Sequence, residues 1–215
     1  SGDYWSAGLF DNIADARSAV QRARTLVSGP VAVVGHSEGA VIAADLARDA
    51  TILDGAVLLA GIAGTGEQTL KYQAVALEPQ IPRLVRGLMK AFGTSVSKQQ
   101  TTQLAKLASS TRDTYRVQLV SKVNAKWFRE FLAYDAAVAL SAAQVPLLAM
   151  TGSKDVQVDP NDLRDMAELV GERITTALLD DVDHILRHET KDFSSPRAYR
   201  TQVARPLDVQ VVEHL

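Results

Sequence analysis

A serine stands between two glycines in the stretch "GPVAVVGHSEGAVIAADLARD", residues 29–49. A serine hydroxyl is a weak nucleophile at neutral pH, so it needs a nearby base and a site that stabilises the oxyanion formed on attack. Ser37 follows a short apolar run and precedes a run of helical character, which places it in a tight turn from a strand into a helix. The pattern predicts a nucleophilic serine lifted out of the backbone contour.

The same turn predicts a site for negative charge. The backbone N–H of Glu38 should point out from the N-terminus of the following helix, where the helix dipole favours anions. We therefore expect the Glu38 amide to contribute to an oxyanion hole. Gly35 and Gly39 are expected because a side chain at either position would collide with a neighbouring strand or helix. The alternative is a glycine-rich turn whose serine does no chemistry.

The elements that must position Ser37 alternate between strands and helices. The expected order is a helix over 12–28, a strand over 31–35, a helix over 40–50, strands over 53–60 and 145–151, a helix over 160–170 with Asp159 as its N-cap, a strand over 174–179 and the start of a last helix in 205–215. This order predicts an α/β fold with a mostly parallel sheet flanked by helices. In such a sheet the all-apolar strand 31–35 should be buried on both faces.

Residues 64–143 interrupt the alternation and carry no convincing strand. They hold amphipathic helical runs, namely "IPRLVRGLMKAF", "TTQLAKLAS" and "KWFREFLAYDAAVAL". We expect a core made of 1–63 and 144–215, with 64–143 inserted as a helical cap or lid over a pocket. The alternative is that this segment only enlarges the core.

The stretch "VAVVGHSEGAVIAADLA" resembles the nucleophile elbow of the α/β-hydrolase superfamily. The likeness is greatest to bacterial esterase-like members in which Gly-His-Ser-Glu-Gly is followed by a strand such as "LDGAVLLAG". It covers most of the chain. It implies an α/β-hydrolase fold and a catalytic triad in the chain order Ser, then Asp or Glu, then His.

Asp155 is the candidate for the triad's acid. It lies just past the strand "VPLLAMTG", and ligand-facing residues gather at the carboxyl ends of strands in open parallel sheets. The resemblance implies the same residue, since the family's acid lies in a Gly-x-x-Asp-x-x-Val run, here Gly152, Asp155 and Val158. Asp159 is the competitor, but it precedes Pro160 and suits a helix cap.

His184 is the candidate for the base among four histidines. It lies a few residues beyond the last strand, in "LLDDVDHILRH", where the resemblance places the family's base. An imidazole there could accept the Ser37 proton while a carboxylate orients its other nitrogen. His188 is the fallback. His36 immediately precedes the nucleophile, so its side chain should pack or form a hydrogen bond beneath the turn.

Composition excludes several classes of partner and site. The 215 residues suit one domain or one domain with an insertion, and a formal net charge of −2 without charge blocks suggests no nucleic-acid partner. The sequence contains no run of 18 apolar residues, so it predicts no membrane span. The absence of cysteine excludes disulfides and thiolate metal sites. No metal spacing or phosphate loop predicts a metal or cofactor. The compartment stays open, with a soluble, cytoplasmic protein favoured.

The start of the chain departs from the family pattern. Only about thirty residues precede Val31 and they contain no clear strand, whereas a full α/β-hydrolase has several strands and a loop with a second oxyanion donor before this point. We expect a partial fold, either a fragment or a reduced hydrolase. Its exposed sheet edge could pair with a second copy to form a homo-oligomer.

The sequence predicts a serine esterase that acts on carboxylic esters of small molecules through Ser37, His184 and Asp155. A peptidase or amidase on the same scaffold is the alternative within enzymes, because it shares the chemistry. The alternative outside enzymes is a binding or assembly module that keeps the serine turn without turnover.

Overall fold

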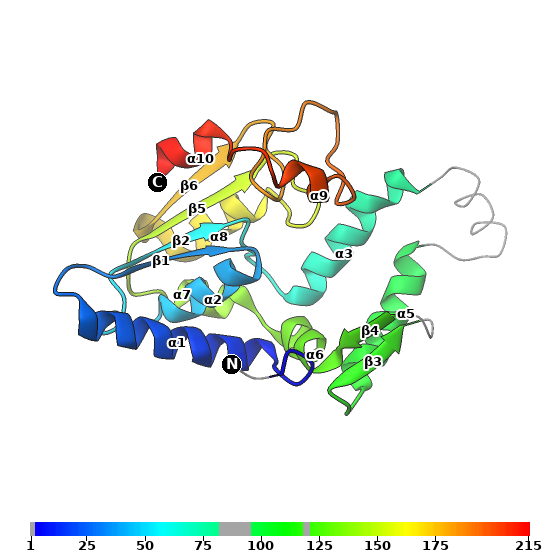
Figure 1. Cartoon of the computed structure of the whole chain (residues 1–215), viewed down its shortest axis with the longest axis horizontal. Coiled ribbons are helices and arrows are strands. Elements are labelled where there is room, and N and C mark those ends of the chain that lie inside the picture. The colour runs from blue at the N-terminus through cyan, green and yellow to red at the C-terminus, as the bar shows by residue number, and fades with distance from the viewer. Residues whose placement is uncertain (1–2, 82–95, 118–120) are drawn as a thin grey trace.

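The computed structural model of the chain describes residues 3–81, 96–117 and 121–215 (Figure 1). Its centre is a four-stranded parallel sheet in the order β1-β2-β5-β6. The strands are β1 (Ala32–His36), β2 (Gly55–Leu59), β5 (Leu147–Gly152) and β6 (Ile174–Leu179). All four run in the same direction, so their carboxyl ends share one edge of the sheet. The predicted α/β class and each of the four predicted strands are confirmed.

Helices cover one face of the sheet much more fully than the other (Figure 1). That face carries α1 (Leu9–Leu26), α2 (Glu38–Leu46), α7 (Ala136–Ser141) and α8 (Asp162–Val170), followed by the short η2 (Gly171–Arg173). The other face holds a small core of Leu59, Met150, Leu179, Val182, Leu186 and Val211. It is covered by the loop after β6 and by α10 (Val209–His214), with α9 (Tyr199–Gln202) before it. Most apolar burial therefore lies between the sheet and the four helices.

The expectation that the first strand is buried on both faces is wrong. β1 is an edge strand of the described sheet, and Val34 in its middle is 58% exposed. The side chain of Val33 points to the helical face and packs against the large core. An all-apolar strand thus has one packed face and one face that the described residues leave open.

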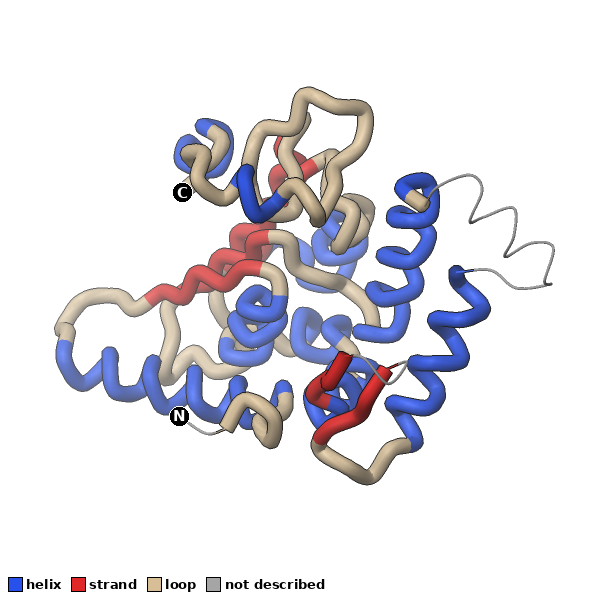
Figure 2. Tube along the Cα trace, turned by 45° about the vertical axis from the view of Figure 1, so that its right-hand side comes forward, coloured by secondary structure: helices blue, strands red, loops and turns tan. Residues whose placement is uncertain are grey.

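The segment 64–143 contains helices and a hairpin at the carboxyl side of the sheet (Figure 2). Its elements are α3 (Gly66–Leu77), η1 (Glu78–Gln80), α5 (Val96–Ser109), β3 (Thr114–Val117), β4 (Ser121–Asn124), α6 (Ala125–Ala133) and α7, which packs with the core helices on the sheet as described above. The expectation of no strand here is wrong, since β3 and β4 pair antiparallel. They are four residues each. Tyr115 and Val117 alternate with polar residues in β3, but β4 shows no such alternation, so the period-2 signal is short and marks one strand only. Most of the predicted run "IPRLVRGLMKAF" lies outside the described residues.

The turn between β1 and α2 and the turn before α8 show which residues set the boundaries of these elements. Gly35 is needed where β1 turns into α2, because a Cβ there would lie 2.0 Å from the backbone oxygen of Gly39. The expected collision at Gly39 itself is wrong, since a Cβ at that position meets nothing within 4 Å. Asp159 is not the N-cap of α8. Asn161 holds that position, and the Asp159 Oδ1 accepts a hydrogen bond from its backbone N–H at 2.9 Å.

Gly35→Ala should destabilise the fold by about 2–3 kcal/mol, because the new methyl group would force the strand and helix apart. Gly39→Ala is the matched control. It places the same methyl group in open space at the start of α2, where alanine is the better helix former, and should raise stability by up to about 1 kcal/mol. Urea unfolding of both variants measures the difference. Equal destabilisation would contradict the close contact at Gly35.

Candidate active site

Ser37 occupies the turn between β1 and α2 in a strained conformation. Its φ of 55° and ψ of −115° lie outside the regions that non-glycine residues usually adopt. The backbone is held there because the Ser37 N–H donates to the Leu59 carbonyl oxygen on the neighbouring strand, at 2.8 Å. Ser37 is the N-cap residue of α2, but its side chain makes no capping hydrogen bond. The hydroxyl is therefore left for another partner.

That partner is His184, whose Nε2 lies 3.1 Å from Ser37 Oγ. On the other side of the ring, His184 Nδ1 lies 2.8 Å from Asp155 Oδ2. A carboxylate can only accept, so Nδ1 carries the proton and Nε2 presents its lone pair to the Ser37 hydroxyl. His184 and Asp155 are 4% and 3% exposed, which shields this contact from water.

The Asp155 carboxylate is held by its own loop. Its Oδ1 accepts hydrogen bonds from the backbone N–H groups of Gln157 at 2.7 Å and Val158 at 2.9 Å. With His184 on Oδ2, three N–H donors surround a buried carboxylate and stabilise its negative charge. The loop just beyond β5 is thus shaped to aim one oxygen at the imidazole.

The structure brings together the three residues predicted from sequence and leaves out both competitors. Asp159 binds the N-terminal turn of α8, as described above. His188 is exposed, and its Nδ1 lies 3.3 Å from Asp208 Oδ2. The expected hydrogen bond of His36 beneath the turn is found, because its Nε2 donates to the carbonyl oxygen of His184 at 2.7 Å. His36 therefore steadies the backbone of the histidine that faces Ser37.

Sequence reasoning missed two residues of α3 that hold the acid loop. The Tyr72 hydroxyl donates to the Asp155 carbonyl oxygen at 2.9 Å, and the Gln73 side-chain amide donates to the Gln157 carbonyl oxygen at 2.9 Å. Burial, together with nearby carboxylates, raises the pKa of Tyr72 to about 12, so the donor stays protonated at neutral pH. The sequence carries no signal for these contacts, since tyrosine and glutamine on a helix are ordinary surface residues.

A cavity of about 290 Å³ opens beside Ser37. Its walls come from the turn after β1, from α2, from the loops after β2 and β5, and from α3 and α6. The lining residues are Ser37, Glu38, Val41, Ala60, Ile62, Thr69, Leu70, Gln73, Trp127, Phe128, Phe131, Gln157 and Val158. Glu38 is the one charged residue among them, so the cavity suits an uncharged and mostly apolar group.

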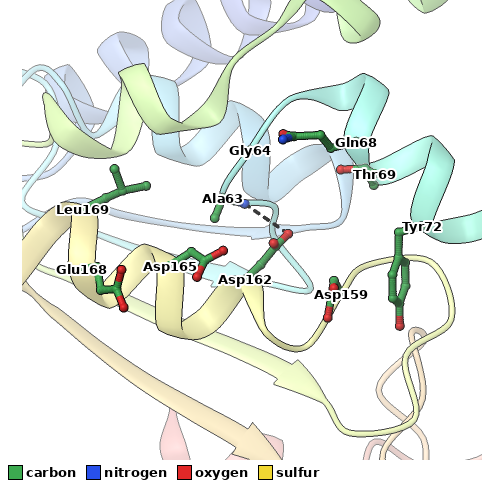
Figure 3. A pocket seen from close by; sticks show the side chains of 10 residues that line it. All are labelled: Ala63, Gly64, Gln68, Thr69, Tyr72, Asp159, Asp162, Asp165, Glu168 and Leu169. Carbon is green, nitrogen blue, oxygen red and sulfur yellow. Dashed lines mark hydrogen bonds between the residues drawn. The ribbon is translucent and has the colours of Figure 1, made fainter.

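A second cavity, of about 480 Å³, is acidic and does not include Ser37 (Figure 3). Asp159, Asp162, Asp165 and Glu168 line it from α8 and the turn before it, and Gln68, Thr69 and Tyr72 line it from α3. Nevertheless, no group of three acidic or histidine side chains in the described ranges is placed to hold a metal ion. Burial and two neighbouring carboxylates raise the pKa of Asp162 to about 6 despite a hydrogen bond from the Ala63 N–H. Thr69 lines this cavity and the one beside Ser37, so the two adjoin at α3.

The parallel sheet, together with a serine, a histidine and an aspartate at its carboxyl edge, defines an α/β-hydrolase. The chain matches the family described as "Serine aminopeptidase, S33" over residues 3–191, and it belongs to this family of hydrolases. No curated protein has a sequence that matches this chain significantly. None of the helices among the described residues is both long and apolar enough to cross a bilayer.

Solved structures share the fold at low sequence identity. The chain superimposes on Est1E from Butyrivibrio proteoclasticus with a TM-score of 0.54 and 13% identity, covering 83% of this chain and 63% of that one. For the putative non-heme bromoperoxidase BpoC from Mycobacterium tuberculosis H37Rv the TM-score is 0.51 and the identity 19%, and the match covers 86% of this chain and 70% of that one. For E-2-(acetamidomethylene)succinate hydrolase the TM-score is 0.53 and the identity 15%, and the match covers 88% of this chain and 72% of that one. The chain thus spans 63–72% of the lengths of these proteins.

The raised pKa of Asp162 predicts a pH-dependent stability. The folded-state pKa of about 6 lies above the unfolded value, so stability is lost as the pH rises from about 4 through 6. Asp162→Asn keeps an acceptor for the Ala63 N–H and removes the charge. We expect it to raise the free energy of unfolding at pH 7.5 by about 1 kcal/mol, a value discounted for partial solvent exposure, and to have little effect at pH 3.5.

Urea unfolding at several pH values measures this difference. Glu172→Gln, at an exposed position outside the cavity, is the control and should show no such trend. If Asp162→Asn changes the free energy of unfolding by the same amount at both pH values, the charge of Asp162 does not destabilise the folded state.

Proposed function

We propose that this chain is a serine hydrolase that cleaves carboxylic esters through Ser37, His184 and Asp155. The observation that carries the proposal is the continuous chain of contacts from Asp155 Oδ2 to His184 at 2.8 Å and from His184 to Ser37 Oγ at 3.1 Å. Ser37 would attack the carbonyl carbon while His184 Nε2 takes its proton, and the ring would pass that proton to the leaving alcohol. Asp155 would orient the ring and stabilise the imidazolium. Water, activated by the same histidine, would then release the acyl group from Ser37.

The Glu38 amide would stabilise the oxyanion of this reaction. Glu38 is the first residue of α2, and its N–H has no acceptor among the described residues. It adjoins the nucleophile and points from the positive end of the helix dipole, which favours the developing negative charge. One such donor is commonly worth about 3–4 kcal/mol of transition-state stabilisation.

The cavity beside Ser37 supports an ester with a small apolar acyl group. Its side chains are mainly aliphatic and aromatic, and its volume of about 290 Å³ lies at the lower end of the range for small-molecule sites. Part of its lining, including Leu70, Trp127 and Phe131, comes from the segment 64–143. This segment would therefore serve as the cap of the pocket.

A peptidase is the second candidate, and one observation favours it. The matched family is described as a serine aminopeptidase, and the cavity holds one carboxylate, that of Glu38, which could bind a substrate's α-ammonium group. However, Glu38 Oε1 already accepts two hydrogen bonds from the protein. Because these hydrogen bonds already occupy the carboxylate, an ester substrate is favoured over a substrate with an α-ammonium group. A binding module without turnover is the remaining alternative, and covalent labelling of Ser37 separates it from both enzymes.

His184→Ala should lower kcat/KM for a p-nitrophenyl ester by about 10⁴-fold or more, because it removes the base that contacts Ser37. His188→Ala is the matched control. It removes the exposed histidine that binds Asp208 and should change kcat/KM by less than about threefold. Wild type should also react with a fluorophosphonate, and Ser37→Ala should not. A folded wild-type protein that neither labels nor hydrolyses any ester would refute the enzyme proposal.

The ester and amide readings differ in which bond is cleaved for the same acyl group. We expect p-nitrophenyl butyrate to be hydrolysed with a kcat/KM at least 10³-fold above that of butyryl p-nitroanilide, whose leaving group is poorer. Alanyl p-nitroanilide should be cleaved no faster than butyryl p-nitroanilide, because none of the described lining residues is dedicated to an amine. The three rates are compared at one pH with one enzyme preparation. A higher kcat/KM for the alanyl substrate would instead assign Glu38 to ammonium binding and establish an aminopeptidase.

A further inference from the structure

Three side chains separate the cavity beside Ser37 from another cavity. Glu38, Trp127 and Phe128 line both the Ser37 cavity, of about 290 Å³, and a neighbouring one of about 330 Å³. The neighbouring cavity is completed by Tyr4, Ala7, Asn12, Lys122, Val123 and Asn124. Ser37 lines the first cavity but not the second. The three shared side chains therefore limit how far a group bound at Ser37 can extend toward the second cavity.

Trp127 is the largest member of this partition, and its indole is held on several sides. The ring N–H donates to Glu38 Oε1 at 2.8 Å. The ring stacks on Phe131, with centroids 4.8 Å apart and planes 12° from parallel, and it meets Phe128 edge-on at 5.1 Å. Its backbone N–H donates to the Asn124 Oδ1 that caps α6, at 2.9 Å. An indole with its polar atom satisfied and its faces packed is fixed in one orientation.

Glu38 is the anchor of the indole. Its Oε1 also accepts a hydrogen bond from the Asn12 side chain at 2.7 Å, so one carboxylate oxygen joins α1, α2 and α6. Glu38 directly follows Ser37 in the chain. The position of the indole is therefore fixed relative to the nucleophile, and not only relative to the other helices of the segment 64–143.

We infer that Trp127, positioned by the Glu38 carboxylate, sets the upper limit of acyl-chain length by closing the Ser37 cavity against its neighbour. This inference rests on the proposed esterase function. At about 30 Å³ for a group the size of a water molecule, the Ser37 cavity holds about ten such groups, which fits acyl groups of up to about eight carbons. Removal of the indole joins the two cavities and admits longer chains. Trp127 is thus a specificity-determining residue, and the Glu38 side chain is a positioning residue.

The test compares kcat/KM for p-nitrophenyl esters from acetate to dodecanoate. For wild type, kcat/KM should fall by at least about tenfold from octanoate to decanoate, since the chain no longer fits. Trp127→Ala should raise the decanoate-to-butyrate ratio of kcat/KM by at least about tenfold, mainly through a lower KM for decanoate. A common decrease for all esters, with an unchanged ratio, would overturn the inference.

Substitutions of two glutamates separate the anchor from general loosening of α6. Glu38→Ala should raise the same ratio because it frees the indole, whereas Glu38→Gln retains an oxygen acceptor for Trp127 and Asn12 and should keep the wild-type ratio. Glu130→Ala is the matched control. It removes a carboxylate of α6 that accepts from the Phe10 N–H outside both cavities, and should also keep the ratio. A raised ratio in Glu130→Ala would show that any loosening of α6 suffices.

Binding to an inactive protein separates this inference from the proposed function. Calorimetry with Ser37→Ala should show that methyl butyrate binds more tightly than methyl decanoate, and Ser37→Ala/Trp127→Ala should reverse this order. If wild type hydrolyses no ester but the reversal occurs, the esterase function falls and the partition stands. If wild type is an esterase but neither the kinetic ratio nor the order of binding changes, the partition falls and the function stands.

Discussion

The hydrogen bond between Ser37 and His184 joins residues that follow opposite edges of the sheet. Ser37 follows β1 and His184 follows β6, and β2 and β5 lie between them. Neighbouring strands lie roughly 4.8 Å apart, so the two strand ends are separated by about 14 Å. A histidine at the end of β6 could not reach Ser37 unless the loop after the strand folded back across the carboxyl edge. The conformation of that loop is the constraint on which the site depends.

Several contacts hold the loop in its returning path. Asp181 and Leu186 adopt positive φ values of 56° and 62°, and Asp183 Oδ1 accepts hydrogen bonds from the N–H groups of Ile185 and Arg187 at 3.0 and 2.9 Å. Burial raises the pKa of Asp183, whose charge is therefore held in the fold at a cost. Gly152 lets the acid loop approach the same segment, because a Cβ there would lie 2.1 Å from the Val182 carbonyl oxygen. Backbone strain and a buried carboxylate are thus found in the loop that directs His184 toward Ser37.

The sequence predicts the site better than it predicts the surroundings of the site. Ser37 and Asp155 follow apolar strands, and topology alone brings the ends of parallel strands to one edge. By contrast, nothing local distinguishes an edge strand from a central one, so the exposure of Val34 could not be foreseen. β3 and β4 are stabilised by pairing with each other and by contact of β3 with α6, whereas the alternation of Tyr115 and Val117 is too short to predict a strand by itself. Tyr72 and Trp127 act through contacts with residues far away in the chain, and a single sequence carries no signal for such pairs.

These long-range contacts change how the segment 64–143 relates to the chemistry. Tyr72 and Gln73 bind carbonyl oxygens of the loop that carries Asp155, and Trp127 binds the side chain of the residue after Ser37. The segment therefore contacts two of the three strand ends that hold the site, and it does so through hydrogen bonds to partly buried polar groups. A cover that only excluded water would need apolar contact and no such bonds. In this fold residues that line the cavity also hold the loop of Asp155 and the turn of Ser37 in place, so the shape of the cavity and the arrangement of Ser37, His184 and Asp155 are set by one network of contacts.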